Sequence, residues 1–269
     1  MFDYHTPDGF DTFGTAIPSY KLTTVTYPSK TTGSERRCHV VLPVDYSTEE
    51  TYPVLYLLHG IGGTEDEWLG GNPAEVVGNL VSKKEAARMI VVIPNIRAAA
   101  DDRVPQDVFG PFNVNAFDNF INDLRDDLMP FIAANYSIRT GRENTAIAGL
   151  SMGGRETLFI STRMADTFGY FGAFSPAPGL LPMASDPVRF PGQLPVSGLR
   201  TPDGAPAPIF MMICAGTEDM IVKVCAEQYH ETLASHGVPH LYYTMPGGHD
   251  FGVWKNGLYH FARTIFHEA

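Results

Sequence analysis

The sequence has 269 residues, of which 44% are hydrophobic and 18% are charged, a composition typical of a globular enzyme. A chain of this length accommodates one large α/β domain, and it shows no internal repeat or linker, so we expect residues 1–269 to form a single domain. The net charge of −11 argues against nucleic acid and anionic membranes as partners, and no apolar run has the length of a membrane span.

The apolar pattern predicts strands that alternate with helices. After an irregular arm over residues 1–20, the expected elements are strands at 21–27, 36–42 and 52–58, a helix at 73–87, a strand at 89–93, a helix at 116–135, a strand and a helix on either side of residue 151, strands at 170–174 and 209–215, a helix at 220–236, a strand at 241–245 and a helix at 253–267. Unbroken apolar runs such as 52–58 are typical of strands buried on both faces. The pattern therefore predicts an α/β fold, with a mainly parallel sheet covered by helices on both faces.

Two long segments separate these elements. Residues 97–114 are expected to form a loop, and residues 176–208 are rich in proline and glycine, as in a lid or binding loop. Pro130 lies inside the helix expected at 116–135 and predicts a kink or a break there.

The ends and the cysteines place few limits on the cellular compartment. The first residues lack the basic and apolar regions of a signal peptide, which leaves a cytoplasmic protein or a secreted one whose signal peptide is absent from this sequence. The three cysteines, Cys38, Cys214 and Cys225, do not make a disulfide framework. Two of them fall in apolar or helical patterns and are expected to be small core residues.

A Gly-x-Ser-x-Gly sequence stands at the centre of the chain. Ser151 is flanked by Gly149 and Gly153, after an apolar run that begins at Ala146 and before a segment that reads as a helix. A strand, a tight turn with serine at its tip and a helix make up a nucleophile elbow. Glycine lacks a Cβ atom, so the strand and the helix can approach closely around the turn. We therefore expect Ser151 to be a nucleophile at the carboxyl end of a strand.

A serine nucleophile needs a base and an orienting carboxylate, which follow it in the chain in α/β-hydrolases. His249 is the favoured base because it follows a strand in a glycine-rich turn; His240, at the start of that strand, is a weaker competitor. Asp219 is the favoured carboxylate because it comes just after the strand at 209–215. Its neighbour Glu218 is the residue to exclude, since one of the two can simply cap the following helix.

An oxyanion needs backbone N–H donors, and two are expected here. One is the N–H of Met152, the residue after the nucleophile, and the other comes from the glycine-rich turn after an early strand. That turn is His59–Gly60–Ile61–Gly62–Gly63, and Ile61 is the expected donor. The sequence contains no His, Cys or Asp cluster at metal-ligand spacing, so we expect neither a metal nor a cofactor.

These stretches together resemble carbohydrate esterase family 1, the feruloyl and acetyl-xylan esterases of plant cell-wall breakdown. The matching segments are residues 58–63 with Trp68, residues 148–154, residues 216–219, and residues 247–251 with Trp254 and Lys255. The resemblance runs from about residue 20 to the end of the chain. It implies an α/β-hydrolase fold, with Ser151 as nucleophile, Asp219 as orienting acid and His249 as base, and it suggests that Trp254 lies near the acyl site.

The resulting hypothesis is an esterase that removes ferulate or a related phenolic acid from xylan-type carbohydrate esters by a two-step acyl-enzyme mechanism. Phe109 and Phe112 in the first long loop, and Phe190 and Leu194 in the second, are expected to form an apolar rim with Trp254, since aromatic walls suit a flat acyl group. An acetyl-xylan esterase is the near alternative. A thioesterase similar to S-formylglutathione hydrolase and a non-catalytic carbohydrate-binding protein are the more distant ones.

Overall fold

The structure, a computed structural model, describes residues 2–12, 20–182 and 190–267. Its strands join one eight-stranded sheet in the order β1-β2-β4-β3-β5-β6-β7-β8. The strands are β1 (Tyr20–Ser29), β2 (Ser34–Pro43), β3 (Val54–Leu58), β4 (Ile90–Pro94), β5 (Thr145–Leu150), β6 (Tyr170–Phe174), β7 (Phe210–Gly216) and β8 (Leu241–Met245). β1 and β2 form an antiparallel hairpin that pairs with β4, and all pairs from β4 to β8 are parallel. The predicted α/β fold with a mainly parallel sheet is confirmed.

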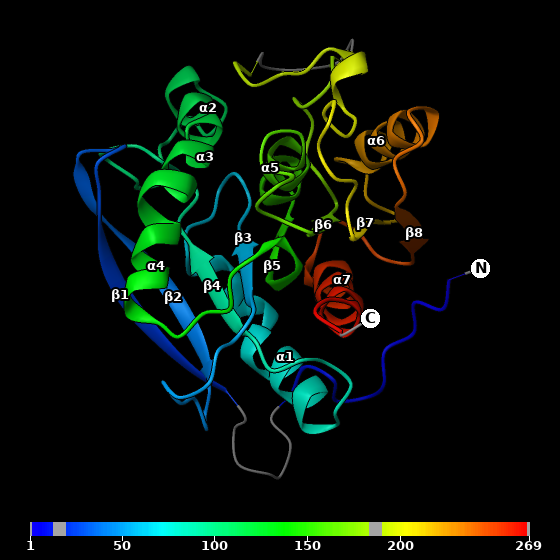
Figure 1. Cartoon of the computed structure of the whole chain (residues 1–269). Helices are drawn as coiled ribbons and strands as arrows, with labels where there is room; N and C mark the ends of the chain where they lie inside the picture. The colour runs from blue at the N-terminus through cyan, green and yellow to red at the C-terminus, as the bar shows by residue number, and fades with distance from the viewer. Residues whose placement is uncertain (1, 13–19, 183–189, 268–269) are drawn as a thin grey trace.

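Helices cover both faces of this sheet (Figure 1). One face carries α1 (Pro73–Ser82) and α7 (Phe251–Thr264), which pack together with Leu55 and Leu57 of β3 in one apolar cluster. The other face carries α2 (Pro111–Asp118), α3 (Phe120–Asp123), α4 (Met129–Asn135), α5 (Met152–Ser161) and α6 (Lys223–Ser235). Val54 and Tyr56 of the same strand belong to this second cluster. Alternate residues of β3 thus face opposite layers, which explains why its sequence is apolar without a break.

The helix predicted at 116–135 begins earlier than expected, and the interruption predicted at Pro130 is found just before that residue. Helical structure already begins at Pro111, inside the segment predicted as loop, because proline is suited to the first turn of a helix. A π-helical stretch, Leu124–Leu128, separates α3 from α4. Pro130 lies in the first turn of α4, and it has no N–H to donate to a preceding carbonyl. The π-helical stretch before it, whose turns are wider than those of an α-helix, accommodates this missing hydrogen bond.

Other predicted helices differ mainly at their ends. α1 stops at Ser82, five residues before the predicted end, and is followed by Lys84 with a φ of 60°. α7 begins at Phe251, because the Asp250 side chain accepts hydrogen bonds from the N–H groups of Gly252 and Val253 and caps the helix there. No helix within the described ranges is long and apolar enough to cross a membrane.

The N-terminal arm is irregular, as predicted, over its described part, and it is attached to the body. Phe2, Tyr4 and Phe10 pack against the cluster under α1 and α7. The Asn79 side chain on α1 donates to the carbonyls of Phe10 and Thr12. Residues 13–19 of the arm, and residues 183–189 of the predicted lid at 176–208, lie outside the described residues.

Candidate active site

The sharp turn between β5 and α5 carries Ser151. Its φ of 50° and ψ of −112° are strained for a residue with a side chain. A Cβ atom on Gly149 would lie 2.5 Å from the Gly153 carbonyl carbon, and one on Gly153 would lie 2.4 Å from the Leu58 carbonyl oxygen. Both glycines are therefore needed for the backbone to pass so closely. The Ser151 N–H donates to the Phe174 carbonyl at the end of β6 at 2.8 Å, which attaches the turn to the neighbouring strand.

Three polar side chains from three separate loops meet at this turn. Ser151 Oγ lies 3.0 Å from His249 Nε2, and His249 Nδ1 lies 2.8 Å from Asp219 Oδ2. A carboxylate can only accept, so Nδ1 carries the ring proton and Nε2 is left free to accept one from the serine. Ser151 and Asp219 are buried, and His249 is partly exposed. The three residues singled out in the sequence are therefore brought into one hydrogen-bonded chain.

The surroundings of Asp219 keep it ionised. Its other oxygen, Oδ1, accepts from the N–H groups of Ile221 and Val222, each at 3.0 Å. Burial opposes ionisation, but the hydrogen bonds from His249 and from these two backbone groups outweigh it and lower the pKa of the carboxyl group. Glu218, the alternative that the sequence offered, points into solvent. The competing His240 contacts His230, 2.8 Å away, and lies apart from the serine.

The turn after β3 lies beside Ser151, and Ile61 and Met152 line the same cavity as the serine and His249. The Met152 N–H is in the first turn of α5, where no carbonyl of the helix itself can accept it. His59 braces the turn: its Nε2 accepts from the Ile96 N–H at 2.8 Å, so Nδ1 carries the proton and donates to the Gly60 carbonyl at 2.7 Å. Complete burial lowers the pKa of His59 to about 3, which keeps the ring neutral.

Two charged residues at this turn were not anticipated from the sequence. Glu67 accepts from the Gly60 N–H at 2.6 Å, and burial raises its pKa despite that bond. Arg97, just after β4, donates to the Ile61 carbonyl at 2.8 Å and to the Gly63 carbonyl at 3.2 Å. The position of Arg97 near a strand end was visible in the sequence, because it lies four residues after the strand predicted at 89–93. The contacts of both residues depend on which strands are neighbours, which the sequence did not reveal.

A cavity of about 620 Å³ opens over Ser151. Phe109, exposed at the rim, and Phe190, buried in the wall, are the aromatic residues that line it. Val222 and Val224 are among the aliphatic residues on its other side. Three of the residues expected at the acyl site lie elsewhere, and the first of these, Leu194, is buried with its N–H donating to the Leu180 carbonyl at 2.7 Å. Phe112 is exposed outside the cavity lining.

Trp254 lies on α7 and is buried instead of lining the cavity. Its ring meets the His249 ring edge-on, with the centroids 5.0 Å apart, and it meets Phe251 in the same way at 5.0 Å. Trp254 therefore packs against the His249 ring without lining the cavity. The sequence showed that Trp254 is near His249, but it could not show from which side, since that depends on the rotation of α7.

A buried ionic cluster supports the cavity wall. The Arg155 side chain, fully buried on α5, pairs with Asp118 of α2 and with Glu156 at 2.6 Å. It also donates to the Gly179 carbonyl at 3.2 Å, and its guanidinium lies over the Phe190 ring, 4.7 Å from the centroid. Burial raises the pKa of Glu156 to about 7. The wall on the Phe190 side is thus fixed by charge and hydrogen bonding as well as by apolar contact.

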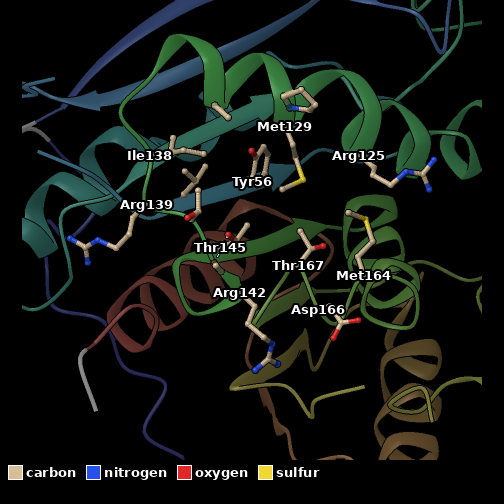
Figure 2. A pocket seen from close by; sticks show the side chains of 15 residues that line it. Tyr56, Arg125, Met129, Ile138, Arg139, Arg142, Thr145, Met164, Asp166 and Thr167 are labelled. Atoms are coloured by element: carbon tan, nitrogen blue, oxygen red, sulfur yellow. Dashed lines mark hydrogen bonds between the residues drawn. The ribbon is translucent and has the colours of Figure 1, made fainter. Parts of the chain in front are cut away.

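A second cavity, of about 470 Å³, lies near the amino ends of β3 and β5. Figure 2 shows that the long side chains of Arg125, Arg139 and Arg142 at its edge extend away from its centre. Its lining contains no serine, cysteine or histidine. Nucleophilic chemistry is therefore expected at the Ser151 cavity.

Comparisons with known proteins agree with this geometry. Residues 29–264 match the model of the Esterase family, described as "Putative esterase". The structure is similar to that of a CE1 ferulic acid esterase from Anaeromyces mucronatus, solved in complex with ferulic acid, with 35% identity, a TM-score of 0.91, and coverage of 99% of this chain and 98% of the other. The feruloyl esterase module from Clostridium thermocellum, complexed with sinapinate, shares the fold at 19% identity, with a TM-score of 0.76 and coverage of 100% and 97%.

One curated relative is much longer than this chain. An endo-1,4-beta-xylanase/feruloyl esterase from Xylanibacter ruminicola is 35% identical over 157 residues, which make up 56% of this chain. The match spans only about a fifth, 21%, of that relative's length.

Proposed function

The chain belongs to the Esterase family, and from this premise we propose that it is a serine esterase that releases ferulic or related phenolic acids from xylan-type carbohydrates. The observation that carries the proposal is the hydrogen-bonded series from Ser151 through His249 to Asp219, at the foot of a largely apolar cavity. We also propose that residues 1–269 form one domain, because every described strand joins the same sheet.

The proposed reaction is a two-step acyl transfer. Ser151 Oγ attacks the ester carbonyl carbon while His249 Nε2 takes the hydroxyl proton, and the imidazolium that forms is stabilised by the Asp219 carboxylate. The N–H groups of Ile61 and Met152 bind the oxyanion. His249 then gives the proton to the departing sugar oxygen. In the second step, water gives a proton to His249 as it attacks the acyl carbon; the bond between that carbon and Ser151 Oγ then breaks, and His249 returns the proton to Oγ, which releases the acid and the free serine.

The dimensions and chemistry of the cavity support a phenolic acyl group. A volume of about 620 Å³ is in the range of sites for drug-sized molecules, and an acetyl group would leave most of it unfilled. Phe109 and Phe190 offer aromatic surfaces, and such contacts add ~0.5–1.5 kcal/mol beyond the burial of apolar area. The complex of the Anaeromyces mucronatus enzyme with ferulic acid is consistent with this substrate class.

A comparison of two esters tests the proposal. Purified protein should hydrolyse methyl ferulate with a higher kcat/KM than methyl acetate, and Ser151→Ala should abolish both activities. Ser161→Ala is a matched control, because this buried serine lies on α5 as well but donates only to the Leu158 carbonyl. A preference for the acetate, or for acetylated xylan, would favour an acetyl-xylan esterase. Full activity in Ser151→Ala would overturn the nucleophile assignment.

A further inference from the structure

Arg97 differs from the other deeply buried arginines. The described part of the chain buries Arg36, Arg97 and Arg155 completely. Arg36 pairs with Asp123 at 3.2 Å, and Arg155 pairs with Asp118 and Glu156. Arg97 has no carboxylate oxygen within 4.0 Å among the residues that the structure describes. Burying a cation without a counter-ion is costly, so its presence calls for an explanation.

The Arg97 guanidinium is satisfied by neutral oxygens, and two of these belong to the oxyanion turn. Nη2 donates to the Ile61 carbonyl, and Nη1 donates to the Gly63 carbonyl and, at 3.2 Å, to the Asp102 carbonyl. Nε donates to the Asn113 side chain of α2. The group is thus fixed from the side by α2 while it holds the carbonyls of Ile61 and Gly63, on either side of Gly62.

His59 and Glu67 hold the turn at Gly60, whereas Arg97 contacts its later part at Ile61 and Gly63. A Cβ atom built on Gly62 would meet no atom within 4 Å, so nothing packs against that side of Gly62, and within the turn itself the Gly63 N–H donates to the Gly60 carbonyl at 3.1 Å. Glycine peptides rotate easily. If the peptide between Ile61 and Gly62 turned over, the Ile61 carbonyl and the Gly62 N–H would exchange sides, and the Ile61 backbone that carries the proposed oxyanion donor would lose its support. A carbonyl dipole directed at the serine would also repel the developing oxyanion.

We propose that Arg97 is a positioning residue of the oxyanion hole, which holds the Ile61 and Gly63 carbonyls away from the Ser151 cavity and places a positive charge behind the turn. Arg97 does not touch the substrate. Its charge acts through the aligned peptide groups, where fixed dipoles stabilise an oxyanion without reorganisation during the reaction. The inference rests on the proposed esterase function and adds a residue that the hydrogen-bonded series of Ser151, His249 and Asp219 does not include.

The test compares Arg97→Met with Arg36→Met. Both variants remove a fully buried guanidinium and are expected to lower thermal stability, but Arg36 donates to the Tyr27 hydroxyl and to the carbonyls of Asn95 and Arg97, and to none of the carbonyls of the oxyanion turn. In Arg97→Met, kcat for an aryl acetate should fall by ~10²–10³, the usual loss for one oxyanion donor, while KM changes little. Labelling of Ser151 by an aryl phosphonate should slow by a similar factor, because the phosphonyl oxygen occupies the same hole. Arg36→Met should keep kcat near the wild-type value.

Two further variants keep the inference testable if Arg97→Met fails to fold. Arg97→Lys retains the charge but loses the two-pronged geometry, so it should show the same type of kcat loss. In Arg97→Ala, added guanidinium ion at concentrations well below those that denature the protein should restore part of kcat. A folded Arg97→Lys or Arg97→Met with wild-type kcat and labelling rate overturns the inference. If the wild type hydrolyses no ester but is still labelled by the phosphonate at a rate that depends on Arg97, the proposed function is refuted and the inference about Arg97 stands.

Discussion

Replacement of Asp219 by asparagine gives the sharpest test of the proposed mechanism. The two side chains have the same shape, so the variant changes one atom and one charge. Asp219 Oδ1 accepts from two backbone N–H groups, those of Ile221 and Val222. An amide NH₂ cannot replace it there, because donors would face donors. The asparagine oxygen must therefore take the Oδ1 position, and its NH₂ group must face His249.

This fixed orientation determines the histidine tautomer. With an NH₂ group 2.8 Å away in place of Asp219 Oδ2, His249 Nδ1 must give up its proton and accept. The ring proton then moves to Nε2, the atom that has to accept from Ser151. The analogous change in a well-studied serine protease lowers kcat by ~10⁴, which corresponds to about 5.5 kcal/mol in the barrier. We expect a loss of that order in Asp219→Asn.

The assay is steady-state hydrolysis of an aryl acetate and of methyl ferulate at neutral pH. Both esters should lose activity by the same factor, because the proton transfer is common to both. Glu218→Gln is the matched control, since it removes the neighbouring carboxylate, which is exposed, and it should retain nearly full activity. A loss below tenfold in Asp219→Asn, or an equal loss in Glu218→Gln, would refute the reasoning.

Three other substitutions probe the elbow, the acyl wall and the buried ionic cluster. Gly153→Ala should prevent formation of the elbow, because its Cβ would lie 2.4 Å from a backbone oxygen. We expect it to lose phosphonate labelling at Ser151 and to have a lower melting temperature. An active, stable variant would contradict this. Phe109→Ala should lower kcat/KM for methyl ferulate by up to about tenfold, from the loss of ~0.5–1.5 kcal/mol of ring contact, and leave methyl acetate unaffected; equal losses would count against a phenolic site. Burial raises the pKa of Glu156 from 4.5 to about 7, so the folded state binds the carboxyl proton more tightly than the unfolded state does. The free energy of unfolding should therefore fall as the pH rises from 4.5 through about 7. Chemical denaturation at several pH values should show that fall in the wild type and a smaller one in Glu156→Gln; identical pH profiles would exclude Glu156 as its source.

The sheet could be predicted from the sequence because its strands are local and strongly apolar. Residues 170–174 and 241–245 coincide with β6 and β8 to the residue. The helical stretch before β5 was harder, because its breaks depend on tertiary packing. Apolar residues continue at helical spacing through the π-helical stretch Leu124–Leu128, so periodicity alone could not reveal that the hydrogen-bond pattern changes there.

In the site as well, features set by neighbouring residues in the chain could be predicted, and features set by tertiary contacts could not. Ser151, Asp219 and His249 each follow a strand, and the carboxyl ends of parallel strands meet at one edge of a sheet, so their meeting could be anticipated from sequence. The aromatic wall of the cavity could not be anticipated, because Phe190 and Phe112 lie in long connections whose sequences have no periodic pattern. Phe190 reaches the cavity through its contact with Arg155, whereas Phe112, on the first turn of α2, faces outward.

The strand order explains why Arg97 was not foreseen and how it could have been. β4 lies directly beside β3 in parallel register, with Val54 opposite Ile90. The segment that follows β4 must therefore run alongside the turn that follows β3, which is the oxyanion turn. Once this neighbour relation is known, a polar residue two or three positions after β4 becomes a candidate support for that turn, and Arg97 occupies such a position. The information in the sequence was the residue type and its distance from a strand end; the missing part was the adjacency of the two strands, which only the assembled sheet supplies.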